Sequence, residues 1–256
     1  MVLRSVSLPA HNNHTHTVIF LHGRGSNARE FSEELWECRD RRGVSLQHIF
    51  PSVKWVFPQT DETYTGPLED RPHKWFDIWS LSDPDKYREL QLPGLQDAIP
   101  QLISLIQSEA AGVGLENVIL AGISQGCATA IHALLNYHKA GTEGNHRLCG
   151  FVGLSGWMSL GAESVHDSRQ LLQLEGFDPD SDSGDDILRN TPAFISHCAD
   201  DPIVAIEQGK RLKDTLTTYG MPITWREYPT GGHWINDPQG VEDIVDFFKR
   251  QGLIGY

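Results

Sequence analysis

The feature that most constrains the fold is an alternation of short apolar runs with amphipathic helical patterns along the chain. The runs are rich in β-branched residues and are bounded by glycine or polar residues, which is typical of buried strands. The predicted strands are 17–21, 55–57, 117–121, 151–155, 193–196 and 223–228. The predicted helices are 31–38, 95–106, 127–137, 208–219 and 241–250. Strands separated by helices predict an α/β fold with a mostly parallel central sheet and helices on both faces.

One domain is expected, because no repeat and no Pro/Gly-rich linker divides the 256 residues. We therefore predict a single α/β domain over residues 1–256. The stretch 161–190 breaks the alternation and carries eight acidic residues against two arginines. We expect this stretch to form an acidic excursion on the surface that is partly mobile.

The charge of the chain excludes two classes of partner. Lys and Arg number 21 against 34 Asp and Glu, which gives a formal net charge of −13. Phosphate backbones and anionic headgroups repel such a chain, so we expect neither nucleic-acid binding nor polybasic docking to membranes.

The chain also shows no sign of a membrane or secretory segment. No apolar run is long enough for a transmembrane helix, and residues 1–10 lack the apolar stretch of a secretory signal. The four cysteines are scattered without a C-x-x-C pair. We expect free thiols in the cytoplasm, with export by a route that the sequence does not show as the alternative.

The segment 122–126, Gly-Ile-Ser-Gln-Gly, lies between a predicted strand and a predicted helix. In that setting the G-x-S-x-G pattern predicts a tight turn that lifts the Ser124 hydroxyl above the sheet as a nucleophile. The helix that follows directs backbone N–H groups at developing negative charge. The alternative is an ordinary glycine-rich turn, but the strand before and the helix after favour the nucleophile.

A serine nucleophile needs a base, and in this fold an acid and then a histidine follow the serine along the chain. Asp201 and His233 each lie on a loop after a predicted strand. We expect His233 to take the proton of Ser124 and Asp201 to fix the tautomer of His233. Spacing does not exclude the neighbouring Asp200. Asp201 is favoured by the proline and the two apolar residues that follow it.

Acyl transfer also needs N–H donors for an oxyanion. One expected donor is the N–H of Gln125, directly after the nucleophile, and the other lies in the loop 22–26 after the first predicted strand. Glycines in this loop allow the backbone to approach a substrate oxygen closely. A plain strand-to-loop turn is the alternative for this segment.

Three histidines, His11, His14 and His16, are a candidate metal-binding cluster. No carboxylate supports them, which favours a solvated segment over a metal site. We therefore predict no metal site at these histidines.

Seven short segments occur in a fixed order over most of the chain. They are VIFLHGRG (18–25), FP (57–58), WFDI (75–78), AGISQG (121–126), LSGW (154–157), DPIV (201–204) and GH (232–233). Together they resemble the acyl-protein thioesterase / lysophospholipase-like carboxylesterase family of α/β-hydrolases. The resemblance implies hydrolysis of thioesters of S-acylated proteins, or of carboxylic esters and lysophospholipids, without metal or organic cofactor.

The resemblance also assigns roles to residues of this sequence. The implied triad is Ser124, Asp201 and His233, and the implied oxyanion donors are the N–H groups of Arg24 and Gln125. Trp157 falls beside the family's acyl pocket. Trp75 and Phe76 are further candidates for substrate contact, with core packing as the alternative for all three aromatic residues.

Two segments depart from the family. Residues 59–74 are mostly polar and charged where the family has an apolar segment, so a long acyl chain would find little apolar cover there. The acidic stretch 161–190 is also longer than expected, and both departures leave room for smaller or more polar esters.

The expected function is that of a serine hydrolase that cleaves ester or thioester bonds through an acyl-enzyme, most of all an acyl-protein thioesterase-like carboxylesterase. Its substrate partner is then an S-acylated protein or a small-molecule ester. The alternatives are a small-molecule esterase or lactonase of secondary metabolism, and a catalytically silent α/β-hydrolase that binds a ligand or partner.

Overall fold

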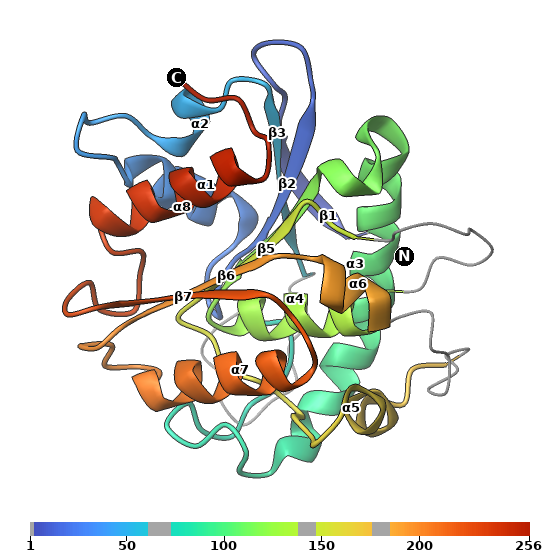
Figure 1. Cartoon of the computed structure of the whole chain (residues 1–256). Coiled ribbons are helices and arrows are strands. Elements are labelled where there is room, and N and C mark those ends of the chain that lie inside the picture. The colour runs from blue at the N-terminus through green and yellow to red at the C-terminus, as the bar shows by residue number, and fades with distance from the viewer. Residues whose placement is uncertain (1–2, 61–72, 138–146, 176–184) are drawn as a thin grey trace.

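The computed structural model describes residues 3–60, 73–137, 147–175 and 185–256, and Figure 1 shows their arrangement around a central sheet. In these ranges seven strands form one sheet in the order β1-β3-β2-β4-β5-β6-β7. The strands are β1 (Arg4–Leu8), β2 (His16–Leu21), β3 (Val53–Gln59), β4 (Val118–Ile123), β5 (Gly150–Leu154), β6 (Ala193–Cys198) and β7 (Ile223–Tyr228). Every neighbouring pair is parallel except β1 with β3. The predicted fold, an α/β-hydrolase with a mostly parallel sheet, is confirmed.

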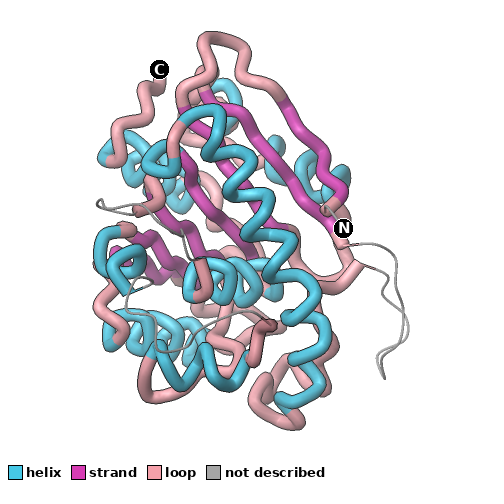
Figure 2. Tube along the Cα trace, turned by 90° about the vertical axis from the view of Figure 1, so that its right-hand side faces the viewer, coloured by secondary structure: helices cyan, strands magenta, loops and turns pink. Residues whose placement is uncertain are grey.

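Helices cover both faces of the sheet. The α-helices are α1 (Ala28–Glu37), α2 (Leu46–Ile49), α3 (Leu92–Val113), α4 (Gln125–Leu135), α5 (Val165–Leu172), α6 (Asp185–Asn190), α7 (Ile206–Thr218) and α8 (Gln239–Arg250). Two short 3₁₀ helices are η1 (Arg88–Gln91) and η2 (Leu115–Asn117). Figure 2, turned by 90°, shows helices in front of the strands and behind them.

The protein has two hydrophobic core clusters, one on each face of the sheet, because side chains alternate along each strand. In β2, Ile19 and Leu21 join the core formed with α3 to α7, whereas Val18 and Phe20 join the core formed with α1, α2 and α8. Successive side chains of a strand point to opposite faces, so a strand covered on both faces is apolar throughout. This is why the central strands were visible in the sequence as unbroken apolar runs.

Each predicted strand and helix is present, with ends displaced by a few residues. Helix α1 begins at Ala28, three residues before the predicted start, because the side chain of Asn27 accepts hydrogen bonds from the N–H groups of Arg29 and Glu30. Such a cap satisfies N–H groups that have no acceptor within the helix.

Strand β1 was not predicted. It lies at the edge of the sheet and pairs antiparallel with β3, with Val6 opposite Phe57. Most of its side chains are exposed or half-buried. An edge strand with one neighbour needs no apolar run, so its five residues carry little signal.

The acidic stretch 161–190 is described except for residues 176–184, and its nature as a surface excursion stays a prediction. Helices α5 and α6 occupy its described ends, and Leu172, Ile187 and Leu188 are buried in the core. The acidic side chains Glu163 and Asp167 are exposed on the outer side. The described part of the stretch is therefore packed onto the core, because apolar residues are spaced among its charges.

A separate observation concerns membranes. Within the described ranges, none of the helices has both the length and the apolar character that crossing a bilayer requires.

Candidate active site

Ser124 lies in a strained turn between β4 and α4. Its φ of 55° is in the left-handed region, which is costly for a residue with a side chain. Its N–H donates to the carbonyl of Leu154 on the neighbouring strand at 2.9 Å, which fixes the turn. The predicted strand-to-helix turn thus presents the serine at the carboxyl edge of the sheet, where ligands bind in open α/β folds.

The glycines on either side of Ser124 are required by close contacts. A Cβ on Gly122 would lie 2.5 Å from the carbonyl carbon of Gly126. A Cβ on Gly126 would lie 2.4 Å from the carbonyl oxygen of His22, at the end of β2. Side chains at these positions would force the turn apart, so the G-x-S-x-G pattern follows from packing.

These contacts predict a large difference between two glycine-to-alanine variants. Gly126→Ala is expected to lower the free energy of unfolding by about 2 to 3 kcal/mol or more, because the methyl group meets backbone that cannot move freely. Gly112→Ala is the matched control, since a Cβ there meets nothing within 4 Å in helix α3. Alanine there is expected to stabilise the helix by up to about 1 kcal/mol.

Urea unfolding of both variants beside the parent chain measures the difference. Equal unfolding midpoints for Gly126→Ala and the parent would contradict the packing account of the turn.

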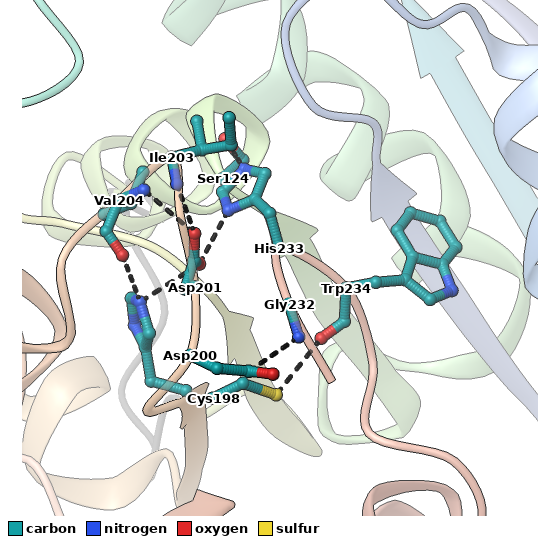
Figure 3. Close-up of polar contacts among 10 residues, drawn as sticks. Ser124, Cys198, Asp200, Asp201, Ile203, Val204, Gly232, His233 and Trp234 are labelled. Carbon is teal, nitrogen blue, oxygen red and sulfur yellow. Dashed lines mark hydrogen bonds and ion pairs between the residues drawn. The ribbon is translucent and has the colours of Figure 1, made fainter. Parts of the chain in front are cut away.

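Three side chains from three loops form a hydrogen-bonded chain (Figure 3). The Ser124 hydroxyl lies 2.8 Å from Nε2 of His233, and Nδ1 of His233 lies 2.7 Å from Oδ2 of Asp201. The side chain of Asp201 is fully buried, whereas that of His233 is 21% exposed. The imidazole is therefore placed between a buried carboxylate and a hydroxyl that it can deprotonate.

Asp201 is held as a carboxylate by several donors. Burial raises the pKa of its carboxyl group, but hydrogen bonds from His197, from His233 and from the backbone N–H of Val204 outweigh it and leave the pKa well below the usual range. Oδ1 accepts from the N–H groups of Ile203 and Val204, each at 2.9 Å. The carboxylate is thus anchored by its own turn and keeps its charge at neutral pH.

Asp200, which spacing left open as the acid, has different contacts. Its carboxylate accepts from the backbone N–H of Gly232 at 2.8 Å (Figure 3). It also accepts from the backbone N–H of Gly231 at 3.3 Å. Both glycines have positive φ values, 138° for Gly231 and 63° for Gly232. The structure therefore brings Asp201 to the ring of His233 and brings Asp200 to the backbone of the loop that carries it.

The loop after β2 passes close to the nucleophile. A Cβ on Gly23 would lie 3.4 Å from Cβ of Ser124. Gln125 is the first residue of α4, so its N–H has no acceptor within the helix. Both predicted oxyanion donors, Arg24 and Gln125, thus lie next in sequence to residues at the site, and their role in holding an oxyanion stays a prediction.

His22 orients the first of these peptide groups. Its Nδ1 lies 2.8 Å from the carbonyl oxygen of Gly23, and burial lowers the pKa of the ring to about 4, so Nδ1–H donates from a neutral imidazole. In a trans peptide the C=O and N–H point in opposite directions. The bond to the Gly23 carbonyl therefore also sets the direction of the Arg24 N–H.

The three predicted substrate aromatics are buried. Trp75 and Phe76 are 2% exposed and Trp157 is fully buried, and the rings of Phe76 and Trp157 meet edge to face at 6.3 Å. Core packing, the alternative for these residues, accounts for their burial. Their contact with a substrate stays a prediction.

The Trp-Phe-Asp segment is hydrogen-bonded to the side chain of Gln125, a contact that the sequence did not reveal. The amide side chain of Gln125 accepts from the N–H of Trp75 at 2.9 Å and donates to the carbonyl of Phe76 at 2.8 Å. The indole N–H of Trp75 donates to the carbonyl of His22 at 2.9 Å. These bonds join the turn, the loop after β2 and the segment 75–76, and no spacing pattern signals a contact between residues about 50 positions apart.

His197 is a second feature that sequence reasoning missed, because it belongs to no recognisable motif. It lies on β6, and its Nε2 is 3.2 Å from Oδ2 of Asp201. Two histidines therefore contact one carboxylate.

The histidine cluster near residue 14 contacts polar neighbours. His14 bonds to Thr17 at 3.0 Å and His16 to Thr15 at 2.9 Å. In the ranges that the structure covers, no three His, Cys, Asp or Glu side chains converge as metal ligands. The polar segment 59–74 has most of its length, 61–72, outside the described residues.

Comparison with known proteins gives consistent matches along the chain. Residues 5–175 match the family model described as Phospholipase/Carboxylesterase. The chain is 28% identical to acyl-protein thioesterase 1 of Gibberella zeae, over 95% of this chain and 93% of that protein. It is 27% identical to acyl-protein thioesterase 1 of Yarrowia lipolytica, over 96% of this chain and 94% of that protein. Its fold is similar to that of Zea mays acyl-protein thioesterase 2, with a TM-score of 0.72, 21% identity, and coverage of 97% of this chain and 98% of that one.

Proposed function

The chain belongs to the phospholipase/carboxylesterase family and is a serine hydrolase, and from this premise we propose that it cleaves carboxylic ester or thioester bonds through an acyl-enzyme formed on Ser124. The observation that carries the proposal is the 2.8 Å contact between the Ser124 hydroxyl and Nε2 of His233, with Asp201 at 2.7 Å on the other ring nitrogen. A serine hydroxyl becomes a strong nucleophile only when a base takes its proton during attack.

In the first half-reaction, Oγ of Ser124 forms a bond to the acyl carbon while its proton passes to Nε2 of His233. The oxygen of the tetrahedral intermediate accepts hydrogen bonds from the N–H groups of Arg24 and Gln125, where charge develops. Collapse breaks the bond to the leaving alcohol or thiol, which receives the proton from His233. Asp201 stabilises the imidazolium that exists between these two proton transfers.

In the second half-reaction, a water molecule replaces the leaving group. His233 takes a proton from the water as its oxygen attacks the acyl carbon, and the proton then returns to Oγ of Ser124 as the acid is released. The side chain of His233 is 21% exposed, which supports access of water to its ring.

We propose an S-acylated protein or a small-molecule ester as the substrate, with the cytoplasm as the compartment. Relatives that match nearly the whole chain are named acyl-protein thioesterase, which supports the thioester. All four cysteines are buried and free, which suits a reducing compartment.

Two measurements on the purified chain test the function. A fluorophosphonate probe should label Ser124 covalently, as shown by mass spectrometry of the labelled peptide. Failure to label the folded chain would reject the proposal in favour of a catalytically silent α/β-hydrolase.

A series of p-nitrophenyl esters and matched S-acyl thiols, from C2 to C16, then separates the substrate classes. Hydrolysis of the longer thioesters supports the acyl-protein substrate. A preference for C2 to C4 esters without thioester hydrolysis would instead support a small-molecule esterase, the alternative that the polar segment 59–74 favours.

A further inference from the structure

His197 and its neighbours enclose the buried side of Asp201. The His197 side chain is fully buried, with Nε2 at 2.8 Å from the carbonyl oxygen of Val204 and at 3.2 Å from Oδ2 of Asp201. Both neighbours can only accept a hydrogen bond, since one is a carbonyl and the other an ionised carboxylate. The proton of the His197 ring is therefore on Nε2, where it donates to the Val204 carbonyl at 2.8 Å and has Oδ2 of Asp201 as a second, longer contact at 3.2 Å.

The other ring nitrogen of His197, Nδ1, is buried and has no hydrogen-bond partner among the described residues. A proton on Nδ1 would be left without an acceptor, which is costly. Nε2 is therefore the ring nitrogen that faces Asp201.

Helix α7 holds this ring in place through Gly209. A Cβ on Gly209 would lie 2.4 Å from Nδ1 of His197 and 3.1 Å from the ring of Trp225. Glycine inside a helix is less favourable than alanine, so its presence here needs a packing reason. The backbone of α7 therefore approaches the imidazole closely at Gly209, where a side chain would displace the ring.

The groups around Asp201 fix the orientation of its carboxylate. Oδ1 accepts two backbone N–H groups from its own turn, and Oδ2 lies 3.2 Å from Nε2 of His197. Oδ2 is also the oxygen that contacts His233. A carboxylate fixed in this way does not have to be ordered when the substrate reacts, which is how such contacts contribute to rate.

We propose that His197 is a positioning residue of the catalytic triad: its Nε2–H holds Oδ2 of Asp201 in the orientation that receives His233. The inference rests on the proposed function, because it assigns a role within the same site. It places a second histidine against the carboxylate, and it explains why residue 209, which packs against that histidine, is a glycine.

Two substitutions at position 197 test the role. His197→Leu fills a similar volume without a donor, whereas His197→Gln keeps an N–H at about the reach of Nε2. We expect kcat to fall about 10- to 100-fold in His197→Leu, with KM changed less than about 2-fold, and to recover most of that loss in His197→Gln. Equal kcat losses in the two variants would overturn the proposal.

A spectroscopic readout separates positioning from general stability. The proton between His233 and Asp201 should give a low-field proton NMR signal that shifts or broadens in His197→Leu and persists in His197→Gln. His132→Leu is the matched control: His132 is also fully buried and bonds a carbonyl, that of Ser159 at 2.7 Å. It should keep the signal and kcat, even where its unfolding midpoint falls.

Gly209→Ala offers an independent route if His197→Leu does not fold. Its methyl group would displace the ring of His197, so the same fall in kcat and the same NMR change are expected. A parent chain that the fluorophosphonate probe does not label would reject the proposed function itself. A labelled and active parent, with kcat and the low-field signal unchanged in His197→Leu or, if that variant does not fold, in Gly209→Ala, would reject only the role of His197.

Discussion

Ser124→Ala is expected to lower kcat for ester hydrolysis by about 10⁶-fold, the loss typical of removing the nucleophile from a serine triad. Without Oγ no acyl-enzyme forms, and His233 has no hydroxyl to deprotonate. What remains is the effect of binding and of the oxyanion donors. Steady-state hydrolysis of p-nitrophenyl acetate, together with loss of fluorophosphonate labelling, measures the effect.

Ser32→Ala is the matched control for this variant. Ser32 is a buried serine of helix α1 whose hydroxyl donates to the carbonyl of Arg29 at 2.8 Å. It should keep both kcat and labelling. If Ser124→Ala hydrolysed the ester as fast as the parent chain, another nucleophile would be responsible and the proposed mechanism would be wrong.

The second large effect distinguishes two adjacent carboxylates. Asp201→Asn is expected to lower kcat about 10⁴-fold, by analogy with the loss of the acid in other serine triads. Oδ1 of the asparagine can still accept from Ile203 and Val204, which turns its NH₂ group toward His233. An NH₂ group at that place donates to Nδ1 and moves the ring proton to Nε2, where it blocks transfer from Ser124.

Asp200→Asn is the control, and it should lower kcat by about 10-fold at most. Asp200 is exposed, and among the described residues its carboxylate accepts hydrogen bonds from the backbone N–H groups of Gly231 and Gly232 in the loop of His233. An asparagine oxygen can still accept one of these bonds. Comparable losses of kcat in the two variants, measured on the same ester, would show that the 2.7 Å contact between Asp201 and His233 does not determine the rate.

The fold was predictable where buried segments have a recognisable hydrophobic pattern in the sequence. Strands β2, β4, β5 and β6 lie inside the sheet with both faces covered, so most of their residues are apolar. Edge strand β1 has exposed and half-buried side chains and lacked that pattern. Helices α5 and α6 were hidden because a few apolar residues anchor them within a strongly acidic stretch.

The order of the site residues along the chain was predictable from the sequence, whereas several of their contacts were not. The serine turn carries its own pattern, and the loops after β6 and β7 had to supply the acid and the base. Spacing could not choose between Asp200 and Asp201, because adjacent residues on one turn point in different directions. The contacts of Gln125 with the segment 75–76, and of His197 with Asp201, depend on how distant elements pack, which no local pattern records.

The hydroxyl of Ser124 and the ring of His233 are 109 positions apart in the chain, and the loop that carries His233 follows β7, at one edge of the sheet. On the proposed mechanism a growing polypeptide therefore remains inert through most of its synthesis, since neither Asp201 nor His233 has emerged when the turn of Ser124 is complete. Recovery of hydrolysis after dilution from denaturant accordingly requires all three loops to be in place, and a truncated product ending before β7 would contribute nothing to it.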